Sequence, residues 1–361
     1  MTEGRAPSDI SSRSAARAID ALRRGWPVSM VSGEDSLHLI SIETAQDVAF
    51  EEQSDAPAEL LISSARAETL KLANQRAAAD VAAPVRVKVA EPLTASLAMA
   101  IADPVLDMKR PMKGPFLAVE IKNKELARAA MELARHATIL PAFLIVSSVE
   151  SDTTSVTPED IANFADAGKL SIATRAKLPV AANEEAEIIA FRSDADATDH
   201  IALVVGKRDS SVPLVRLHSE CLTGDVLGSL KCDCGPQLHD ALGRMTKANW
   251  GVLLYLRQEG RGIGLINKLR AYALQDQGFD TVDANNRLGF ATEARDFSVA
   301  SHMLMALGIE SIKLLTNNPE KVTGIEAAGV NVAERVPIKI VANPYNEHYL
   351  DTKRDRTGHK L

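Results

Sequence analysis

The sequence predicts an α+β (mixed α/β) protein of two domains, each a mixed sheet with packed helices. The chain has 361 residues, which is enough for two domains. Its composition, 46% hydrophobic and 25% charged, can fill two cores and is unlike that of a disordered chain. Helical and strand patterns alternate along the chain until an acidic, alanine-rich stretch at residues 179–199. We place the boundary just before that stretch, which gives domains at 1–172 and 173–361.

The first half begins with a helix expected over residues 15–24, and a strand over 26–31 follows the break at Gly25. Residues 157–167 are expected to form a helix because Thr157 is followed by Pro-Glu-Asp, a helix-start pattern. The other expected elements of this half are strands at 60–63, 86–89, 141–147 and 170–174 and an amphipathic helix at 124–136.

In the second half, apolar strands are expected at 188–191 and 252–256. The latter strand leads into a glycine-rich turn at 259–264 and then into a helix over 265–277. A strand–helix–strand pattern closes this half, at 311–315, 319–328 and 330–336.

The bulk composition argues against a nucleic-acid or membrane partner. The net charge is -7 and only 4% of residues are aromatic, whereas nucleic-acid-binding domains usually carry a basic face and stacking aromatics. No apolar run approaches the roughly 20 residues needed to cross a bilayer. The first residues contain no continuous apolar stretch, and Glu3, Asp9 and Asp20 disfavour a transit peptide. We therefore expect a cytoplasmic protein.

The three cysteines of the chain, Cys221, Cys232 and Cys234, lie within fourteen positions. In a cytoplasmic protein such a cluster indicates a metal-binding or catalytic site more readily than a disulfide. Thiolates favour zinc, and three protein ligands leave a position for water, as in catalytic zinc sites. Two alternatives stay open: a closed structural site completed by His218 or His239, and reduced cysteines in the core or in redox chemistry.

Charged and glycine-rich segments surround the cysteines. Residues 216–220 read Arg-Leu-His-Ser-Glu, which suits an anionic substrate beside a metal. The glycines of the turn at 259–264 allow backbone N–H groups to approach phosphate oxygens, and Arg261 can add a bidentate contact. Segment 316–321 lies between a strand and a helix, which suits phosphate contacts, and segment 285–296 adds further charged residues. Each segment also fits a capped helix start with surface charge. Neither a P-loop nor the usual zinc deaminase pattern is present.

Several segments of the second half follow one another in a specific order: Arg-Leu-His-Ser-Glu-Cys-Leu-Thr-Gly-Asp, Lys-Cys-Asp-Cys-Gly-x-Gln-Leu, Tyr-Leu-Arg-Gln-Glu-Gly-Arg-Gly-Ile-Gly-Leu and Thr-Asn-Asn-Pro-x-Lys. Together they resemble GTP cyclohydrolase II, and the resemblance covers residues 173–359. It implies zinc-dependent hydrolysis of GTP to formate, pyrophosphate and 2,5-diamino-6-(5-phospho-ribosylamino)pyrimidin-4(3H)-one, the first step of riboflavin biosynthesis. It also implies Mg²⁺ with the triphosphate and a homodimer.

The same resemblance implies roles for individual residues. Cys221, Cys232 and Cys234 would hold the zinc. The GTP site would be lined by Arg216, Leu217, His218, Ser219, Glu220, Gln237, Glu259, Gly260, Arg261, Thr281, Thr316 and Lys321.

Three further residues would take part in the reaction. Tyr272 stands where members that release formate carry Tyr, whereas a sister type that stops at the formamide carries Met, so we expect formate release. Glu293 stands where the family has a proton-accepting Asp, and Arg295 where it has an Arg proposed to attack the α-phosphorus. Because a guanidinium stays protonated in proteins, an alternative role for Arg295 is to clamp charge as pyrophosphate leaves.

The first half resembles a different enzyme. Residues 18–25 and 43–45 resemble the start of 3,4-dihydroxy-2-butanone 4-phosphate synthase, and residues 131–174 resemble its last helix–strand–helix–strand unit. Residues 32–40 stand in place of the acidic loop of that synthase, and residues 122–129 stand in place of its Arg-x-Gly-His-Thr-Glu. We therefore expect a degenerate domain that is inactive as a synthase.

The alternative function is that of a non-catalytic guanine-nucleotide sensor. The degenerate first half and the Glu293 substitution favour a sensor, whereas the intact cysteine and nucleotide motifs favour an enzyme.

Overall fold

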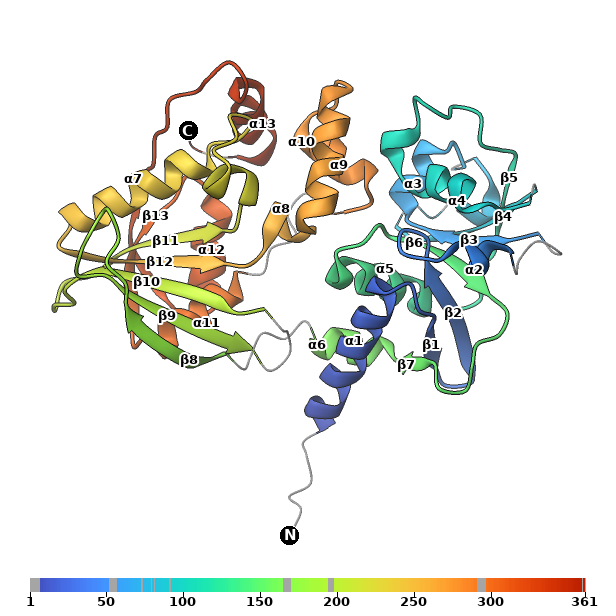
Figure 1. Cartoon of the computed structure of the whole chain (residues 1–361), viewed down its shortest axis with the longest axis horizontal. Coiled ribbons are helices and arrows are strands. Elements are labelled where there is room, and N and C mark those ends of the chain that lie inside the picture. Colours follow the sequence, from blue (N-terminus) through green and yellow to red (C-terminus); the bar gives the residue numbers. More distant parts are fainter. Residues whose placement is uncertain are drawn as a thin grey trace, which may run out of the picture. The chain divides into compact units, whose positions relative to one another are not determined.

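The computed structural model describes residues 7–51, 57–72, 74–78, 80, 82–90, 92–164, 170–193, 198–290, 297–358 and 360. The chain divides by its internal packing into two compact units (Figure 1). The first unit comprises Met1–Asp166, Ile266–Phe279 and Asp283–Thr292, and the second comprises Ala167–Leu265, Asp280–Val282 and Glu293–Leu361. Each contains a mixed sheet with helices, which confirms the predicted α+β class. The boundary at residue 172 rests on the change in composition along the sequence, and it stays a prediction.

A seven-stranded sheet forms the centre of the first unit. Its strand order is β5-β4-β3-β6-β2-β1-β7, and all neighbours are antiparallel except β1 and β7. The strands are β1 (Val28–Ser32), β2 (Asp35–Ser41), β3 (Glu59–Ile62), β4 (Val85–Val89), β5 (Phe116–Val119), β6 (Ala142–Val146) and β7 (Thr154–Val156).

Helices α1 (Pro7–Arg23), α5 (Lys124–Ala137) and α6 (Pro158–Phe164) pack on one another and on β1. Helix α5 begins where Asn123 Oδ1 accepts hydrogen bonds from the backbone N–H groups of Glu125 and Leu126, an N-cap that satisfies two donors. The apolar stripe of each helix joins the sheet in one core, in which Leu22 and Phe143 are fully buried. The remaining helices of this half are α2 (Asp47–Glu51), α3 (Ser64–Thr69), η1 (Arg76–Ala78), α4 (Ala95–Ala102) and η2 (Pro104–Leu106).

Two helices from the second half of the chain also belong largely to the first unit. These are α9 (Gly264–Asp276), from Ile266 onward, and α10 (Thr281–Arg287), from Asp283 onward. The first unit is therefore built from both halves of the sequence.

The second unit contains another seven-stranded sheet, with the order β14-β13-β11-β12-β10-β9-β8. Neighbouring strands are parallel from β14 to β12 and antiparallel from β12 to β8. The strands are β8 (Leu170–Lys177), β9 (Glu187–Ser193), β10 (His200–Gly206), β11 (Leu214–Ser219), β12 (Trp250–Leu256), β13 (Ser311–Leu315) and β14 (Asn331–Val336).

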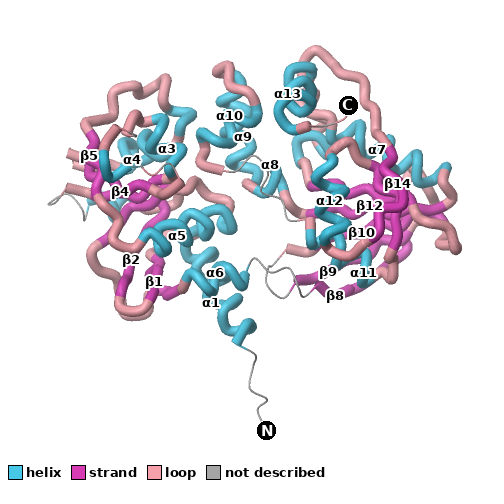
Figure 2. The backbone as a smooth tube through the Cα atoms, turned by 180° about the vertical axis from the view of Figure 1, so that it is seen from behind, coloured by secondary structure: helices cyan, strands magenta, loops and turns pink. Residues whose placement is uncertain are grey.

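Two apolar cores lie against this sheet, and Figure 2 shows the helices packed along its strands. Helices α11 (Ser298–Ala306) and α12 (Pro319–Ala327) share one core with β11 and β12, whereas α7 (Cys234–Lys247) contributes to the other. Along β10, β11 and β12, residues of one core alternate with residues of the other, as a pleated sheet requires. The remaining helices are the π-helical turn η3 (Leu222–Val226), α8 (Glu259–Gly262) and α13 (Glu347–Thr357).

Most predicted elements occur close to their predicted bounds, with three corrections. Helix α1 begins at Pro7 rather than at residue 15, and residues 259–262 of the predicted glycine-rich turn form the short helix α8. The strand predicted at 170–174 exists as β8, but it pairs with β9 in the second sheet. The assignment of that strand to the first half is therefore wrong, because strand pairing depends on partners that a local pattern does not encode. None of the helices in the described ranges combines the length and apolarity needed to cross a bilayer.

Candidate active site

Three parallel strand ends meet at one edge of the second sheet. Strand β11 lies between β12 and β13 and runs parallel to both. The segment 216–220 ends β11, the glycine-rich turn at 259–264 follows β12, and the segment 316–321 follows β13. Because the carboxyl ends of neighbouring parallel strands lie at the same edge, motifs far apart in the sequence come together there.

The cysteines cluster just beyond the end of β11. Their Sγ atoms all lie within 4.8 Å of one another, and those of Cys221 and Cys232 are 3.7 Å apart. All three are free cysteines, and Cys221 and Cys232 are buried. Tetrahedral zinc with Zn–S bonds of about 2.3 Å separates its sulfur ligands by roughly 3.8 Å. Both the donor atoms and their spacing therefore fit a zinc ion.

The thiols of this cluster resist ionisation when no cation is present. Hydrogen bonding to the Cys221 thiol raises the pKa of both Cys232 and Cys234, and burial raises the pKa of Cys234 further. Since the thiolate is the ligand form, a bound cation would lower these pKa values and release the thiol protons.

Gly224 leaves room for the sulfur atoms. A Cβ atom at this position would lie 2.6 Å from Cys232 Sγ and 3.0 Å from Cys221 Sγ. The backbone N–H of Gly224 also donates to Cys221 Sγ at 3.3 Å. The turn η3 therefore wraps closely around the cluster and depends on a glycine there.

Neither nearby histidine completes the cluster. Within the described ranges, the group that could hold a metal consists of the three cysteines. His239 Nδ1 lies 2.8 Å from the carbonyl oxygen of Gly235, and His218 Nε2 lies 3.0 Å from Asp225 Oδ1. This arrangement favours an open site with three protein ligands over the closed alternative.

Asp225 connects the cysteine loop, which comprises residues 221–234, to the sheet. Its Oδ2 accepts hydrogen bonds from the backbone N–H of Cys221 at 3.1 Å and from the Tyr255 hydroxyl at 3.0 Å. The His218 ring stacks on the Tyr255 ring, with centroids 5.7 Å apart. Burial and the Asp225 carboxylate raise the pKa of Tyr255, so its hydroxyl remains a donor.

His218 is held in its neutral form. Burial lowers the pKa of His218, and the charges of Arg216 and Lys321 lower it further against the opposing effect of Asp225. The Nε2–H of a neutral His218 then donates to Asp225. Its Nδ1 is left as a buried acceptor without a partner among the described residues.

The strand pleat separates the predicted residues of β11. Leu217 is fully buried in the core shared with α11 and α12. Arg216 instead contacts Gln237 on α7, and His218 contacts Asp225. The Leu217 side chain is thus a core residue, whereas its neighbours on both sides point toward the face that carries the cysteines.

A series of buried polar contacts extends from Arg216. Its guanidinium donates to the Leu315 carbonyl oxygen at 3.0 Å and to Gln237 Oε1. Gln237 Nε2 donates to Asp233 Oδ2 at 2.5 Å, and Lys353 Nζ donates to Asp233 Oδ1 at 2.8 Å. Burial alone would raise the pKa of Asp233, but the charge and hydrogen bond of Lys353, together with a backbone hydrogen bond and the charge of Arg216, lower that pKa. These contacts connect α7 and α13 to the ends of β11 and β13.

The segment after β13 supplies a buried cation and a hydroxyl. Lys321 is buried, and its Nζ donates to the carbonyl oxygen of Leu217 at 2.9 Å. Thr316 is also buried, and its Oγ1 accepts from the backbone N–H of Asn318 at 3.1 Å. Asn318 Oδ1 caps α12 by accepting from the N–H of Glu320, so the capped-helix reading of this segment holds as well.

The segment after β12 lies against the cysteine loop. Glu259 Oε2 accepts from the backbone N–H of Leu222 at 2.7 Å, and Gly260 has a φ of +64°, which favours glycine. Glu220 pairs with Arg257 at 2.8 Å. Ser219 is the last residue of β11. Glu259 thus links the glycine-rich turn to the residue that follows Cys221.

The remaining predicted residues are Tyr272, Thr281, Arg261, Glu293 and Arg295. Tyr272 lies on α9 in the first unit, and Thr281 is the first residue of α10. Arg261 belongs to α8, but its side chain lies outside the description, and Glu293 and Arg295 lie outside the described residues.

Four residues of this site were not predicted to have a role: Asp225, Tyr255, Asp233 and Lys353. Asp233 adjoins two cysteines in sequence and Asp225 follows Cys221 by four residues, and this closeness is a signal in the sequence. Tyr255 and Lys353 are distant in sequence, and only the pairing of β11 with β12 and the packing of α13 bring them close.

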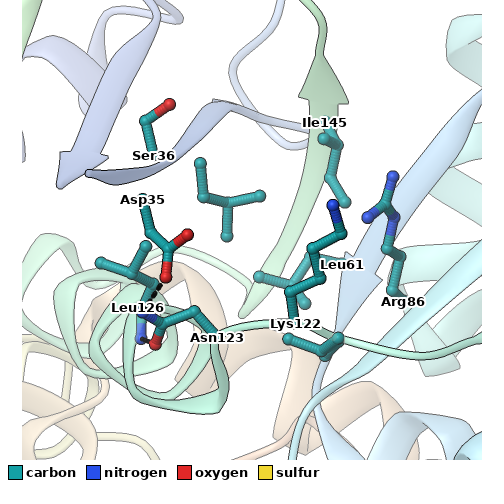
Figure 3. A pocket seen from close by; sticks show the side chains of 10 residues that line it. Asp35, Ser36, Leu61, Arg86, Lys122, Asn123, Leu126 and Ile145 are labelled. Atoms are coloured by element: carbon teal, nitrogen blue, oxygen red, sulfur yellow. Dashed lines mark hydrogen bonds between the residues drawn. The ribbon is translucent and has the colours of Figure 1, made fainter. Parts of the chain in front are cut away.

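A separate cavity of about 100 Å³ lies in the first unit (Figure 3). It brings together the two segments that depart from the synthase pattern, because both Asp35 and Lys122 line it. Asp35 accepts a hydrogen bond from Asn123 at 3.0 Å on one side, and Lys122 and Arg86 lie on the other side (Figure 3). Its other lining residues are Ser36, Leu37, Leu61, Ile121, Leu126 and Ile145. Asp35 is the one carboxylate among these described lining residues.

Comparisons with known proteins agree with the second half of the sequence. Residues 171–337 match the family model of GTP cyclohydrolase II. A GTP cyclohydrolase-2 from Azospirillum brasilense is 38% identical over 369 residues, covering 97% of this chain and 94% of that protein. A GTP cyclohydrolase-2 from Cronobacter sakazakii is 56% identical over 175 residues, covering 48% of this chain and 89% of that protein.

Among solved structures, the chain matches a two-domain 3,4-dihydroxy-2-butanone 4-phosphate synthase from A. baumannii. The sequence identity is 16% and the TM-score is 0.30, with 91% of this chain and 99% of that chain covered. A likeness at this level supports no conclusion about fold or function.

Proposed function

Because this chain belongs to the GTP cyclohydrolase II family, we propose that it hydrolyses GTP to formate, pyrophosphate and 2,5-diamino-6-(5-phospho-ribosylamino)pyrimidin-4(3H)-one. The chain is a hydrolase. The observation that carries the specific reaction is the meeting of the cysteine cluster with the carboxyl ends of β11, β12 and β13. That edge joins a soft-metal site to buried cations suited to a polyphosphate.

Cys221, Cys232 and Cys234 would hold zinc, and no histidine among the described residues joins them. Zinc bound by three thiolates supplies Lewis-acid chemistry and lowers the pKa of a water at its open position to near neutrality. The protein's own contribution is to fix the thiolates. Gly224 leaves space for them, and Asp225 holds the backbone of Cys221.

Arg216 and Lys321 supply positive charge at the same edge, where Thr316 and the glycine-rich turn add hydroxyl and backbone donors. Gln237 orients Arg216, and neutral His218 adds no charge of its own. We assign GTP recognition to these residues together with Leu217 through its backbone, Ser219, Glu220, Glu259, Gly260, Arg261 and Thr281. Mg²⁺ would accompany the triphosphate, and the protein would act as a homodimer in the cytoplasm.

Three proposed roles depend on the family pattern. Tyr272 would support the second hydrolytic step, which releases formate. Glu293 would accept a proton, and its side chain is one methylene longer than the Asp of the family. Arg295 would stabilise the charge of the departing pyrophosphate, because a guanidinium is a poor nucleophile while protonated.

The reaction can be tested by incubating the purified chain with GTP and Mg²⁺ and measuring formate and pyrophosphate. We expect both products, and we expect a zinc chelator to abolish them until zinc is restored. Turnover that survives complete removal of zinc, checked by metal analysis, would contradict the mechanism. Tight GTP binding without either product would instead identify a nucleotide sensor.

We further propose that the first unit is inactive as a 3,4-dihydroxy-2-butanone 4-phosphate synthase. Its cavity offers one carboxylate, Asp35, which Asn123 already engages, whereas a divalent cation is usually held by several oxygen ligands. Lys122 adds positive charge, which disfavours a cation further, whereas Arg86 is paired with Glu59. With ribulose 5-phosphate and Mg²⁺, we expect no formate and no butanone phosphate above a protein-free blank. Zinc-independent formate production from ribulose 5-phosphate would overturn this proposal.

A further inference from the structure

Helix α9 carries Tyr272, yet most of it packs in the first unit. Its polar side chains reach residues of the first half of the chain that are far away in sequence. Asn267 Nδ2 donates to the carbonyl oxygen of Thr138 at 2.9 Å, and Gln277, just after the helix, donates to that of Val105 at 3.1 Å. Hydrogen bonds at both ends thus hold this helix against the first half.

Arg270 lies between these two contacts and joins two carboxylates. Its Nε donates to Asp103 Oδ2 and its NH1 donates to Glu43 Oε1, each at 3.0 Å. The three side chains are largely buried, with 15% of Arg270, 11% of Asp103 and 8% of Glu43 exposed. Since the guanidinium is a planar fork, two carboxylates at fixed positions define its direction as well as its place.

Both carboxylates are themselves fixed by the first half. Glu43 Oε2 accepts from the backbone N–H of Leu140 at 2.7 Å, and Asp103 Oδ1 accepts from that of Val105 at 2.9 Å. Arg270 NH1 also donates to Asn267 Oδ1 at 2.9 Å, so the contacts of α9 form one network.

The chain after α10 also approaches the first half closely. Gly289 has a φ of +86°, and a Cβ atom there would lie 2.6 Å from Ser63 Oγ and 2.7 Å from Pro141 Cγ. The segment from α9 to Gly289 is therefore fixed at both of its ends against the first half.

We propose that Arg270 is a positioning residue for the hydrolysis of GTP, through which the first half sets the place of α9 and hence of Tyr272. Tyr272 lies two positions after Arg270, and Lys268 Nζ lies 5.8 Å from the centre of its ring. This inference rests on the proposed function, because Tyr272 matters only if GTP is opened and deformylated. It gives the first half a role that needs no chemistry in its own cavity.

The test compares Arg270→Gln, Arg270→Lys and the wild type with GTP and Mg²⁺. A displacement of α9 by about 1 Å is enough to slow a positioned step by up to roughly 100-fold. We expect Arg270→Gln to release formate at least about 10-fold more slowly and to accumulate the formylated pyrimidine, with little change in KM for GTP or in zinc content. Arg270→Lys, which keeps the charge and loses the fork, should be intermediate.

Glu59→Gln is the matched control. It breaks a partly buried ion pair that Glu59 forms with Arg86 and Lys88, both on β4 in the same unit. A wild-type product ratio and rate in Arg270→Gln would overturn the proposal, and so would an equal loss in Glu59→Gln. If Arg270→Gln does not fold, Asp103→Asn and Glu43→Gln carry the same test, since each leaves Arg270 one carboxylate. Absence of formate and pyrophosphate in the wild type would instead count against the proposed function.

Discussion

Replacing Gly224 by alanine is expected to remove zinc from the cysteine cluster while all three thiols remain in place. The new methyl group would lie 2.6 Å from Cys232 Sγ and 3.0 Å from both Cys221 Sγ and Cys234 Cβ. None of these atoms can retreat easily, because Cys221 and Cys232 are buried and the Gly224 backbone is itself bonded to Cys221. We expect the affinity for zinc and the release of formate each to fall by roughly 100-fold or more.

The measurement is zinc content by metal analysis after dialysis, together with formate release from GTP. Gly243→Ala is the control, since a Cβ atom at this position of α7 meets nothing within 4 Å and should even stabilise the helix, by up to about 1 kcal/mol. Cys232→Ser gives the reference for a lost ligand. Full zinc occupancy in Gly224→Ala would show that the turn η3 can yield, and it would weaken the assignment of the cluster as a compact zinc site.

The spacing of the cysteines alone predicts the metal ligands of this site but not the residues that surround them. Three cysteines within fourteen positions indicated a metal, and the structure gathers their sulfurs. Nothing in the local pattern indicated that Tyr255, on another strand, would share Asp225 with the cysteine loop. That contact follows from the register of β11 on β12, which pairs His218 with Tyr255.

The same reasoning explains what was missed in the fold. Apolar runs indicated strands such as β6 and β12 correctly, because burial on both faces leaves a continuous apolar signal. The partner of β8 and the packing of α9 on the first half had no such local signal. Both depend on contacts between distant residues, such as Arg270 with Glu43.

The second large effect, on the stability of the fold, is expected at the buried ion pair between Asp233 and Lys353. Asp233 lies between two of the cysteines, and its side chain is 2% exposed. Lys353, on α13, reaches it at 2.8 Å, and Gln237 donates to its other oxygen. Since removal of one partner leaves the other as an uncompensated buried charge, Lys353→Met is expected to lower the free energy of unfolding by about 3–5 kcal/mol.

The pKa of Lys353 determines how its contribution to stability depends on pH. Burial alone would lower the pKa of Lys353, but Tyr349 and Asp233 outweigh it and raise that pKa above its ordinary value. The contribution of Lys353 to stability is therefore complete below the unfolded pKa of about 10.4 and is lost only as the pH rises through the folded value. Across the neutral range, the loss in Lys353→Met should not depend on the ionisation of Lys353.

A double-mutant cycle separates the pair from its parts. Adding Asp233→Asn to Lys353→Met removes the uncompensated charge and should recover part of the lost stability, because an amide can still accept from Gln237. Lys313→Met, which breaks an exposed pair with Glu334, is the control and should change stability by less than about 1 kcal/mol. Chemical denaturation of the zinc-loaded protein measures the free energies of the wild type, Asp233→Asn, Lys353→Met, the double variant and the Lys313→Met control. If the free energy of unfolding of Lys353→Met matches that of the control, α13 does not anchor the cysteine loop. The series of buried polar contacts from Arg216 then ends at Asp233.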